Sequence, residues 1–131
     1  MAEIQSSSTG LSGEYFVAAE LLRRGFSVGI TMGNAKAIDI LAEKKNKQYI
    51  IQVKSIFKRQ NSGWPMMKDK VSTKILYVFV VLNGDKMSHP DFFISTGKEA
   101  KRKVNQYRTR GLITVSSLNN EQFAKRWDKI K

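Results

Sequence analysis

Residues 37–56 read AIDILAEKKNKQYIIQVKSI, and this stretch decides the fold. Two apolar runs, residues 37–43 and 48–56, flank the short polar segment 44–47. Apolar runs of this length, joined by a short polar turn, predict a β-hairpin. Asp39 lies inside the first run, and Gln52 and Lys54 lie inside the second. Polar side chains in such runs are costly to bury unless they are paired or bind a ligand, so the hairpin is the expected place of a functional site.

The length of the turn decides which of these side chains face one another. A two- or four-residue loop within residues 44–47 places Glu43 opposite Gln48 and Asp39 opposite Gln52. Opposed residues share a face with their Cβ atoms roughly 4.5–5.5 Å apart, and Lys54 shares the face of Gln52. The predicted cluster is therefore Asp39, Gln52 and Lys54, and a three- or five-residue loop breaks it unless a bulge restores the register. A structural ion pair between Asp39 and Lys54 is the alternative interpretation.

The rest of the chain predicts an α/β fold, a mixed β-sheet flanked by helices. Residues 1–9 are expected to be a loose segment, and residues 10–131 a single domain. Ser12 is a plausible N-cap of the first helix, and Gly25 is placed to end it. The expected helices are 11–24, 67–72, 97–108 and 120–130, and the expected strands outside the hairpin are 26–31, 75–82, 91–95 and 112–116.

Glu14 is the second acid of the predicted site. At about 100° per residue, Glu14 lies within the apolar helix face of Ala18 and Leu21, whereas Glu20 points the other way. An acid that faces the sheet needs a partner or a ligand. The alternative is that a carboxylate in the first turn simply stabilises the helix dipole.

The charge of the chain favours a polyanionic partner. Its 131 residues contain 23 Lys+Arg against 11 Asp+Glu, a formal net charge of +12, and no cysteine. Nucleic acid is favoured over a membrane surface, because no apolar run approaches the roughly 20 residues that span a bilayer. The absence of cysteine excludes disulfides and thiolate metal sites, and the first residues lack the pattern of a signal peptide. We therefore expect a cytoplasmic protein.

Two groups of basic residues are candidates for nucleic-acid contact. The first lies around the predicted site and comprises Lys36, Lys58, Arg59, Lys68 and Lys70. The second is the late basic segment with Lys98, Lys101, Arg102, Lys103, Arg108 and Arg110, for which a solvated helix face is an equal alternative.

The predicted cluster suits phosphodiester hydrolysis assisted by a hard cation. Mg²⁺ prefers oxygen ligands, and it both activates water and clamps phosphate oxygens. Asp39 is the first candidate ligand, joined by the Gln52 amide, the Val53 carbonyl and Glu14. Lys54 is placed to orient water or to offset phosphate charge.

In order and spacing, these residues resemble the PD-(D/E)xK nuclease superfamily, which includes many restriction enzymes and archaeal Holliday junction resolvases. The resemblance covers roughly residues 10–56 and rests on Gly13-Glu14, Ala19-Glu20-Leu21, Gly25-Phe26, Ile38-Asp39-Ile40 and Gln52-Val53-Lys54. It implies a restriction-endonuclease-like fold and a magnesium site, with Mn²⁺ as a substitute, formed by Glu14, Asp39, Gln52 and Lys54. Two departures are Gln52 in place of the usual acid and Ile38 in place of proline.

The resulting hypothesis is a metal-dependent DNA endonuclease. Cutting both strands needs two sites, so a homodimer is expected. The alternatives are a nucleic-acid-binding module on a nuclease scaffold whose catalysis has decayed, and a basic structural protein without a site.

Overall fold

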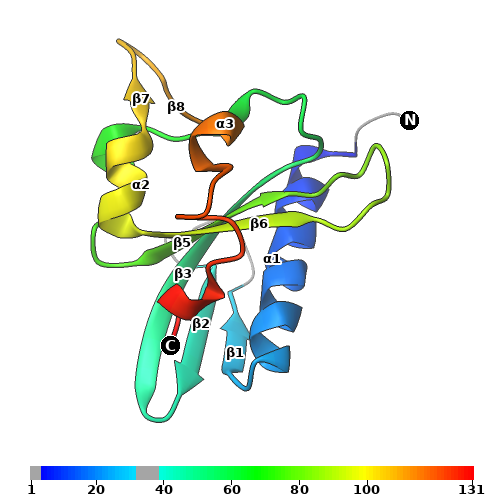
Figure 1. Ribbon diagram of the computed structural model, residues 1–131, viewed down its shortest axis with the longest axis vertical. Helices are drawn as coiled ribbons and strands as arrows, with labels where there is room; N and C mark the ends of the chain where they lie inside the picture. Colours follow the sequence, from blue (N-terminus) through cyan, green and yellow to red (C-terminus); the bar gives the residue numbers. More distant parts are fainter. Residues whose placement is uncertain (1–3, 32–38) are drawn as a thin grey trace.

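A five-stranded mixed sheet forms the centre of the computed structural model, which describes residues 4–31 and 39–131. Its strands are β1 (Ser27–Ile30), β2 (Ile40–Lys44), β3 (Lys47–Ile56), β5 (Leu76–Val81) and β6 (Asp91–Thr96), in the order β1-β2-β3-β5-β6 (Figure 1). The pair β3 and β5 is parallel, and the other neighbours are antiparallel. A smaller sheet has the order β4-β8-β7, from β4 (Gly63–Pro65), β8 (Gly111–Thr114) and β7 (Asn105–Gln106).

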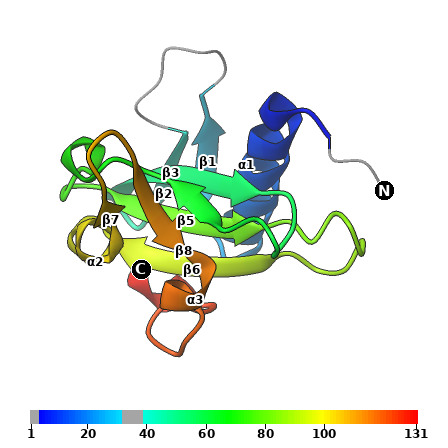
Figure 2. The ribbon, with the colours of Figure 1, turned by 90° about the horizontal axis from the view of Figure 1, so that it is seen from above.

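The main sheet has an apolar core on each face. Helix α1 (Ser6–Arg23) covers one face, and α2 (Gly97–Lys103), α3 (Val115–Leu118) and the smaller sheet cover the other (Figure 2). Val17 and Leu21 of α1 bury against the first face, whereas Trp64 and Ile113 of the smaller sheet bury against the second. This arrangement confirms the predicted mixed sheet flanked by helices in a single domain.

The predicted hairpin and its register are confirmed. Lys44 pairs with Lys47 and Glu43 pairs with Gln48, so the loop contains two residues. Both loop residues, Lys45 and Asn46, have positive φ angles of 51° and 66°. Positive φ at both positions defines a type I′ turn, whose twist matches that of paired strands and fixes their register.

Helix α1 begins at Ser6, earlier than predicted, so residues 6–9 are helical and do not belong to a loose segment. Ser12 is an interior helical residue, because Gln5 is the N-cap. The early turns are helical despite their serines since Thr9 is buried in line with Gly13 and Val17, at a spacing of four residues. Gly25, with φ of 95°, follows the helix as predicted.

The segment between β3 and β5 leaves the main sheet and builds the second core. Within it, Trp64 of β4 is 1% exposed, and its Nε1 donates a hydrogen bond of 3.1 Å to the Val80 carbonyl oxygen. The helix predicted at 67–72 is a short 3₁₀ turn, η1 (Lys68–Lys70), with exposed lysines. This turn lies on the face of the sheet opposite α1 (Figures 1 and 2).

Two predicted helices are wrong in part. The helix predicted at 97–108 ends at Lys103, because Val104 is buried in the second core and Asn105 pairs with Leu112 in the β7–β8 hairpin. The helix predicted at 120–130 is replaced by an isolated bridge between Ala124 and Phe93 and a 3₁₀ turn, η2 (Trp127–Lys129).

The C-terminal segment covers the edge of β6. Phe92 and Ile94 of that strand exchange backbone hydrogen bonds of 2.9 Å with Lys125 and Phe123. Phe123 then enters one core and Trp127 the other. The apolar residues of this segment are spaced as in a helix, but the segment instead wraps around the edge of the sheet at β6. Within the described residues, no helix combines the length and the apolar composition needed to cross a bilayer.

Two glycines of α1 provide a stability test of how the helix meets the sheet. A Cβ at Gly13 would overlap the Ser55 side chain, whereas a Cβ at Gly10 meets nothing within 4 Å. We expect Gly13→Ala to lower the free energy of unfolding by roughly 1–3 kcal/mol through overpacking, and Gly10→Ala to raise it by about 0.5–1 kcal/mol through helix propensity. Urea unfolding measures both changes, and Ser55→Gly should partly rescue Gly13→Ala. Equal stabilisation by both alanines would contradict the close approach of α1 to β3.

Candidate active site

Asp39 immediately precedes β2 and bonds to the neighbouring strand β3. Its backbone N–H donates to the Ile51 carbonyl oxygen at 3.3 Å, one residue out of register with the Ile40–Ile51 pair. The bond to the Val53 N–H is made by the side chain, because Asp39 Oδ2 accepts it at 2.8 Å. Asp39 is 5% exposed, so its carboxylate is held in the interior against the backbone of β3.

The backbone N–H of Val53 points toward the side of β3 on which Asp39 lies. The N–H and C=O groups of one strand residue lie on the same side of the strand. The Val53 carbonyl is therefore directed toward the side from which Asp39 bonds its N–H. At this position β3 presents a backbone oxygen beside a buried carboxylate.

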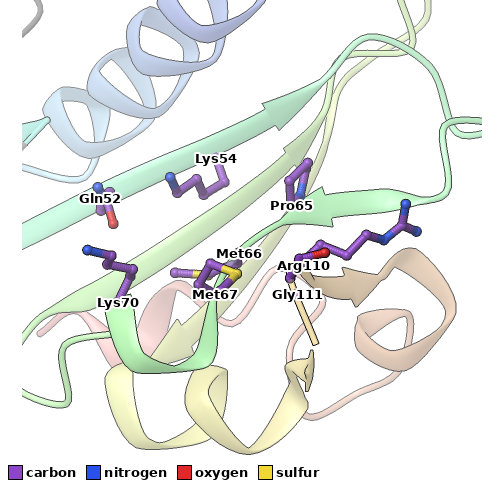
Figure 3. Close-up of a pocket in the computed structure, with 9 residues that line it drawn as sticks. Gln52, Lys54, Pro65, Met66, Met67, Lys70, Arg110 and Gly111 are labelled. Carbon is purple, nitrogen blue, oxygen red and sulfur yellow. The ribbon is translucent and has the colours of Figure 1, made fainter. Parts of the chain in front are cut away.

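Gln52 and Lys54 project from the face of the sheet opposite α1. They line a cavity of about 390 Å³ together with the β4 segment, η1 and the start of β8. Figure 3 shows the ammonium end of Lys70 directed toward Gln52, and Arg110 extending beyond Pro65 at the other end of the cavity. The lining residues are Gln52, Lys54, Pro65, Met66, Met67, Lys70, Thr109, Arg110 and Gly111.

Glu14 belongs to the other face. It is 6% exposed on α1, as the helical face predicted. Its neighbour Gly13 lies against Ser55 and Val53, and these two residues alternate with Gln52 and Lys54 along β3. Glu20 points away from this contact, and a hydrogen bond from Arg23 holds the pKa of Glu20 below its usual range.

The structure thus brings some predicted residues together and separates others. Gln52 and Lys54 share one cavity, which neither Asp39 nor Glu14 lines. Asp39 lies at the strand edge in contact with Val53. The alternative ion pair is not formed, since no salt bridge joins Asp39 to Lys54 among the described residues.

The predicted nucleic-acid contacts have different surroundings. Lys68 and Lys70 are exposed on η1, and Lys70 lines the cavity. Arg59 instead forms a 2.6 Å salt bridge with Asp91, which partly neutralises its charge. Lys58 follows the end of β3, whereas Lys36, like Ile38 of the compared motif, lies outside the described residues.

Arg110 lines the cavity, whereas the sequence predicted it only as part of the late basic segment. It reaches the cavity because the predicted helix stops at Lys103 and the chain turns back as the β7–β8 hairpin. The turn residues Arg108-Thr109-Arg110-Gly111, with a glycine after two arginines, were the available signal for this hairpin.

The oxygen donors around Asp39 define which ion this place suits. No cluster of three His, Cys, Asp or Glu side chains able to hold a metal occurs in the part of the chain that the structure describes. The oxygen donors at Asp39 are its buried carboxylate and the Val53 carbonyl, whereas the Gln52 amide lies in the cavity and Glu14 lies on the other face. Carboxylate, carbonyl and amide oxygens suit a hard divalent cation and exclude a soft one.

Two solved nucleases share this fold. The bacterial homing endonuclease I-Ssp6803I matches with a TM-score of 0.64 and 11% sequence identity, covering 97% of this chain and 93% of that one. A Holliday junction resolvase from the archaeal hyperthermophile Archaeoglobus fulgidus matches with a TM-score of 0.52 and 15% identity, covering 83% and 91%. Searches with family models and against curated sequences find no match. The restriction-endonuclease-like fold predicted from residues 10–56 is therefore confirmed.

Replacing Asp39 tests its role in the ladder. Asp39→Ala removes the acceptor of the buried Val53 N–H, and an unsatisfied buried donor costs roughly 1–3 kcal/mol. Asp39→Asn retains an acceptor oxygen and should cost less. Unfolding by urea in the presence of a chelator measures both free energies without any contribution from metal. Equal stability of Asp39→Ala and the unaltered protein would rule out this bond as a structural element.

Proposed function

We propose that this protein is a metal-dependent endonuclease that hydrolyses DNA phosphodiester bonds. The observation that carries the proposal is the buried Asp39 carboxylate hydrogen-bonded to the β3 backbone at Val53, next to a face that presents Gln52 and Lys54. The fold, shared with a homing endonuclease and a Holliday junction resolvase, supports this assignment.

Asp39, Gln52, Val53 and Glu14 would hold the metal, and Mg²⁺ is the ion that these oxygen donors fit, with Mn²⁺ as a substitute. When bound, such an ion lowers the pKa of a coordinated water and neutralises charge on the phosphate. The position of Asp39 favours this role, because its carboxylate is buried and forms no salt bridge with a lysine among the described residues. A carboxylate kept in the interior with one backbone donor retains oxygen lone pairs for a cation.

The lysines of the cavity serve the substrate. Lys54 and Lys70 line the same cavity as Gln52, so a phosphate bound there meets two ammonium groups. Their charge offsets that of the phosphate and stabilises the additional negative charge that develops as water attacks. Lys54 lies on a strand, which positions it more rigidly than a loop would.

A second candidate function is a nucleic-acid-binding module without catalysis. Gln52 favours it, because a neutral amide occupies the place where the resemblance expects an acid. An amide holds a divalent cation less strongly than a carboxylate does, since it contributes no charge. This candidate predicts salt-dependent DNA binding without cleavage at any metal concentration.

Double-strand cleavage would require two copies of the site. We propose a homodimer in that case, because most soluble oligomers of one chain are symmetric and a two-fold axis relates two equivalent sites. The proposed partners are therefore DNA and a second copy of this chain, and the proposed location is the cytoplasm.

Incubation with plasmid, four-way-junction and single-stranded DNA tests the proposed activity. Cleavage should require Mg²⁺ or Mn²⁺ and stop with chelator. Asp39→Ala and Lys54→Ala should each lower the rate at least about 100-fold, the scale of losing one electrostatic contact to the transition state. Lys47→Gln, an exposed charge removal at the far end of β3, is the matched control and should cleave normally. Binding without cleavage by the unaltered protein with both metals would instead establish the binding module.

A further inference from the structure

We propose that the β7–β8 hairpin is an arm that grips the DNA backbone beside the cavity of Gln52 and Lys54. The arm comprises Gln106, the turn residues 107–110 and Gly111. The proposal deepens the function proposed above and rests on it for the position of the cut. The arm residues themselves are exposed at its turn, and Figure 1 shows the hairpin projecting from the body of the molecule.

The arm has a fixed shape and a fixed attachment. Its turn is closed by a 2.7 Å hydrogen bond from the Tyr107 N–H to the Arg110 carbonyl oxygen. The side-chain amide of Gln106 also donates to the carbonyl oxygens of Tyr107 and Arg110, at 2.6 and 3.1 Å. Its oxygen accepts a 2.8 Å bond from the Lys68 N–H, so Gln106 joins the arm to η1. A surface held in this way loses little conformational entropy when it binds.

The arm connects two neighbouring hollows into one surface. Arg110 and Gly111 line the cavity that contains Gln52 and Lys54 (Figure 3). On its other side the arm lines a second, open cavity of about 500 Å³ with η1 and α2, and Met67 belongs to both. The second cavity is lined by Met67, Lys68, Asp69, Lys101, Gln106, Tyr107 and Arg108. A phosphate backbone that enters the first hollow can therefore continue along the arm.

The charge of this surface is almost entirely positive. Its cations are Lys54, Lys68, Lys70, Lys101, Arg108 and Arg110, and its only acid among the lining residues is Asp69. None of these cations forms a salt bridge within the described residues, whereas Glu20, Asp91, Glu99 and Asp128 each pair with a cation elsewhere. Cations without acidic partners can contact phosphates. The counterions that the DNA then releases drive binding.

Tyr107 adds a contact of a different kind. Tyr107 is 55% exposed and lines the second cavity beside Lys68, Lys101 and Arg108. An exposed aromatic ring among phosphate-binding cations is suited to pack against a sugar or a base. The spread of cations over two hollows favours a continuous duplex backbone over a single phosphate group.

Fluorescence anisotropy with a labelled DNA duplex, in chelator and over a range of salt concentrations, tests the arm. The double variant Arg108→Gln/Arg110→Gln should raise Kd at least tenfold at low salt and lower the slope of log K against log salt by about 1.8, or about 0.9 for each lost phosphate contact. Tyr107→Ala should weaken binding several-fold with the slope unchanged. Circular dichroism of each variant verifies the fold.

The matched control is Lys45→Gln/Lys47→Gln, which removes the same charge from the exposed β2–β3 turn and should change Kd less than twofold. Equal losses in the arm and control variants would overturn the arm, and tighter binding of single-stranded DNA or RNA than of duplex would overturn the duplex assignment.

Binding measured in chelator does not depend on cleavage. Arm-dependent binding by a protein that never cleaves therefore overturns only the nuclease proposal, and cleavage with arm-independent binding overturns only this inference.

Discussion

The account depends on one hydrogen bond, from the Val53 N–H of β3 to the carboxylate of Asp39, the residue that precedes β2. Because a side chain makes this bond, a buried carboxylate is held against the backbone of β3. The bond is possible only in the register that the two-residue Lys45-Asn46 turn imposes. A shift of one residue would move every side chain of the hairpin to the other face.

The proposed site residues come from both faces of β3. Glu14 comes from α1, which packs on the Val53 and Ser55 face, whereas Gln52 and Lys54 face the cavity on the other side. The Asp39 carboxylate bonds to the backbone of β3 between these groups. The close fit of Gly13 against Ser55 determines how near α1 can approach β3. The same division separates the acid-bearing helix from the cationic surface of η1 and the β7–β8 hairpin.

The hairpin could be predicted from the sequence because both of its signals are local. Two apolar runs and a short polar turn predict the register of the hairpin, and the structure has that register from the Lys44–Lys47 pair to the Ile40–Ile51 pair. The buried face of α1 was predictable from helical periodicity, and it contains Glu14 as expected. The start of α1 was not predictable, since the buried contact of Thr9 outweighs the low helix propensity of its neighbours.

The far half of the chain was harder to predict because its structure depends on distant partners. Residues 120–130 have a helical apolar spacing, yet they bond to β6 and distribute their aromatic side chains between two cores. Arg110 reached the cavity only through pairing of Asn105 with Leu112, and the turn signal at residues 108–111 does not specify that pairing. The metal ligands, nucleic-acid contacts and dimer remain predictions, since they concern partners rather than the chain itself.

The most direct test of the central claim is a crystal structure of the protein grown with Mn²⁺, with data collected to locate the metal by anomalous scattering. The account predicts a peak within coordination distance of Asp39, with Gln52 or the Val53 carbonyl as a further ligand. No peak, or a peak bound elsewhere while Asp39 stays hydrogen-bonded to Val53 alone, would contradict it.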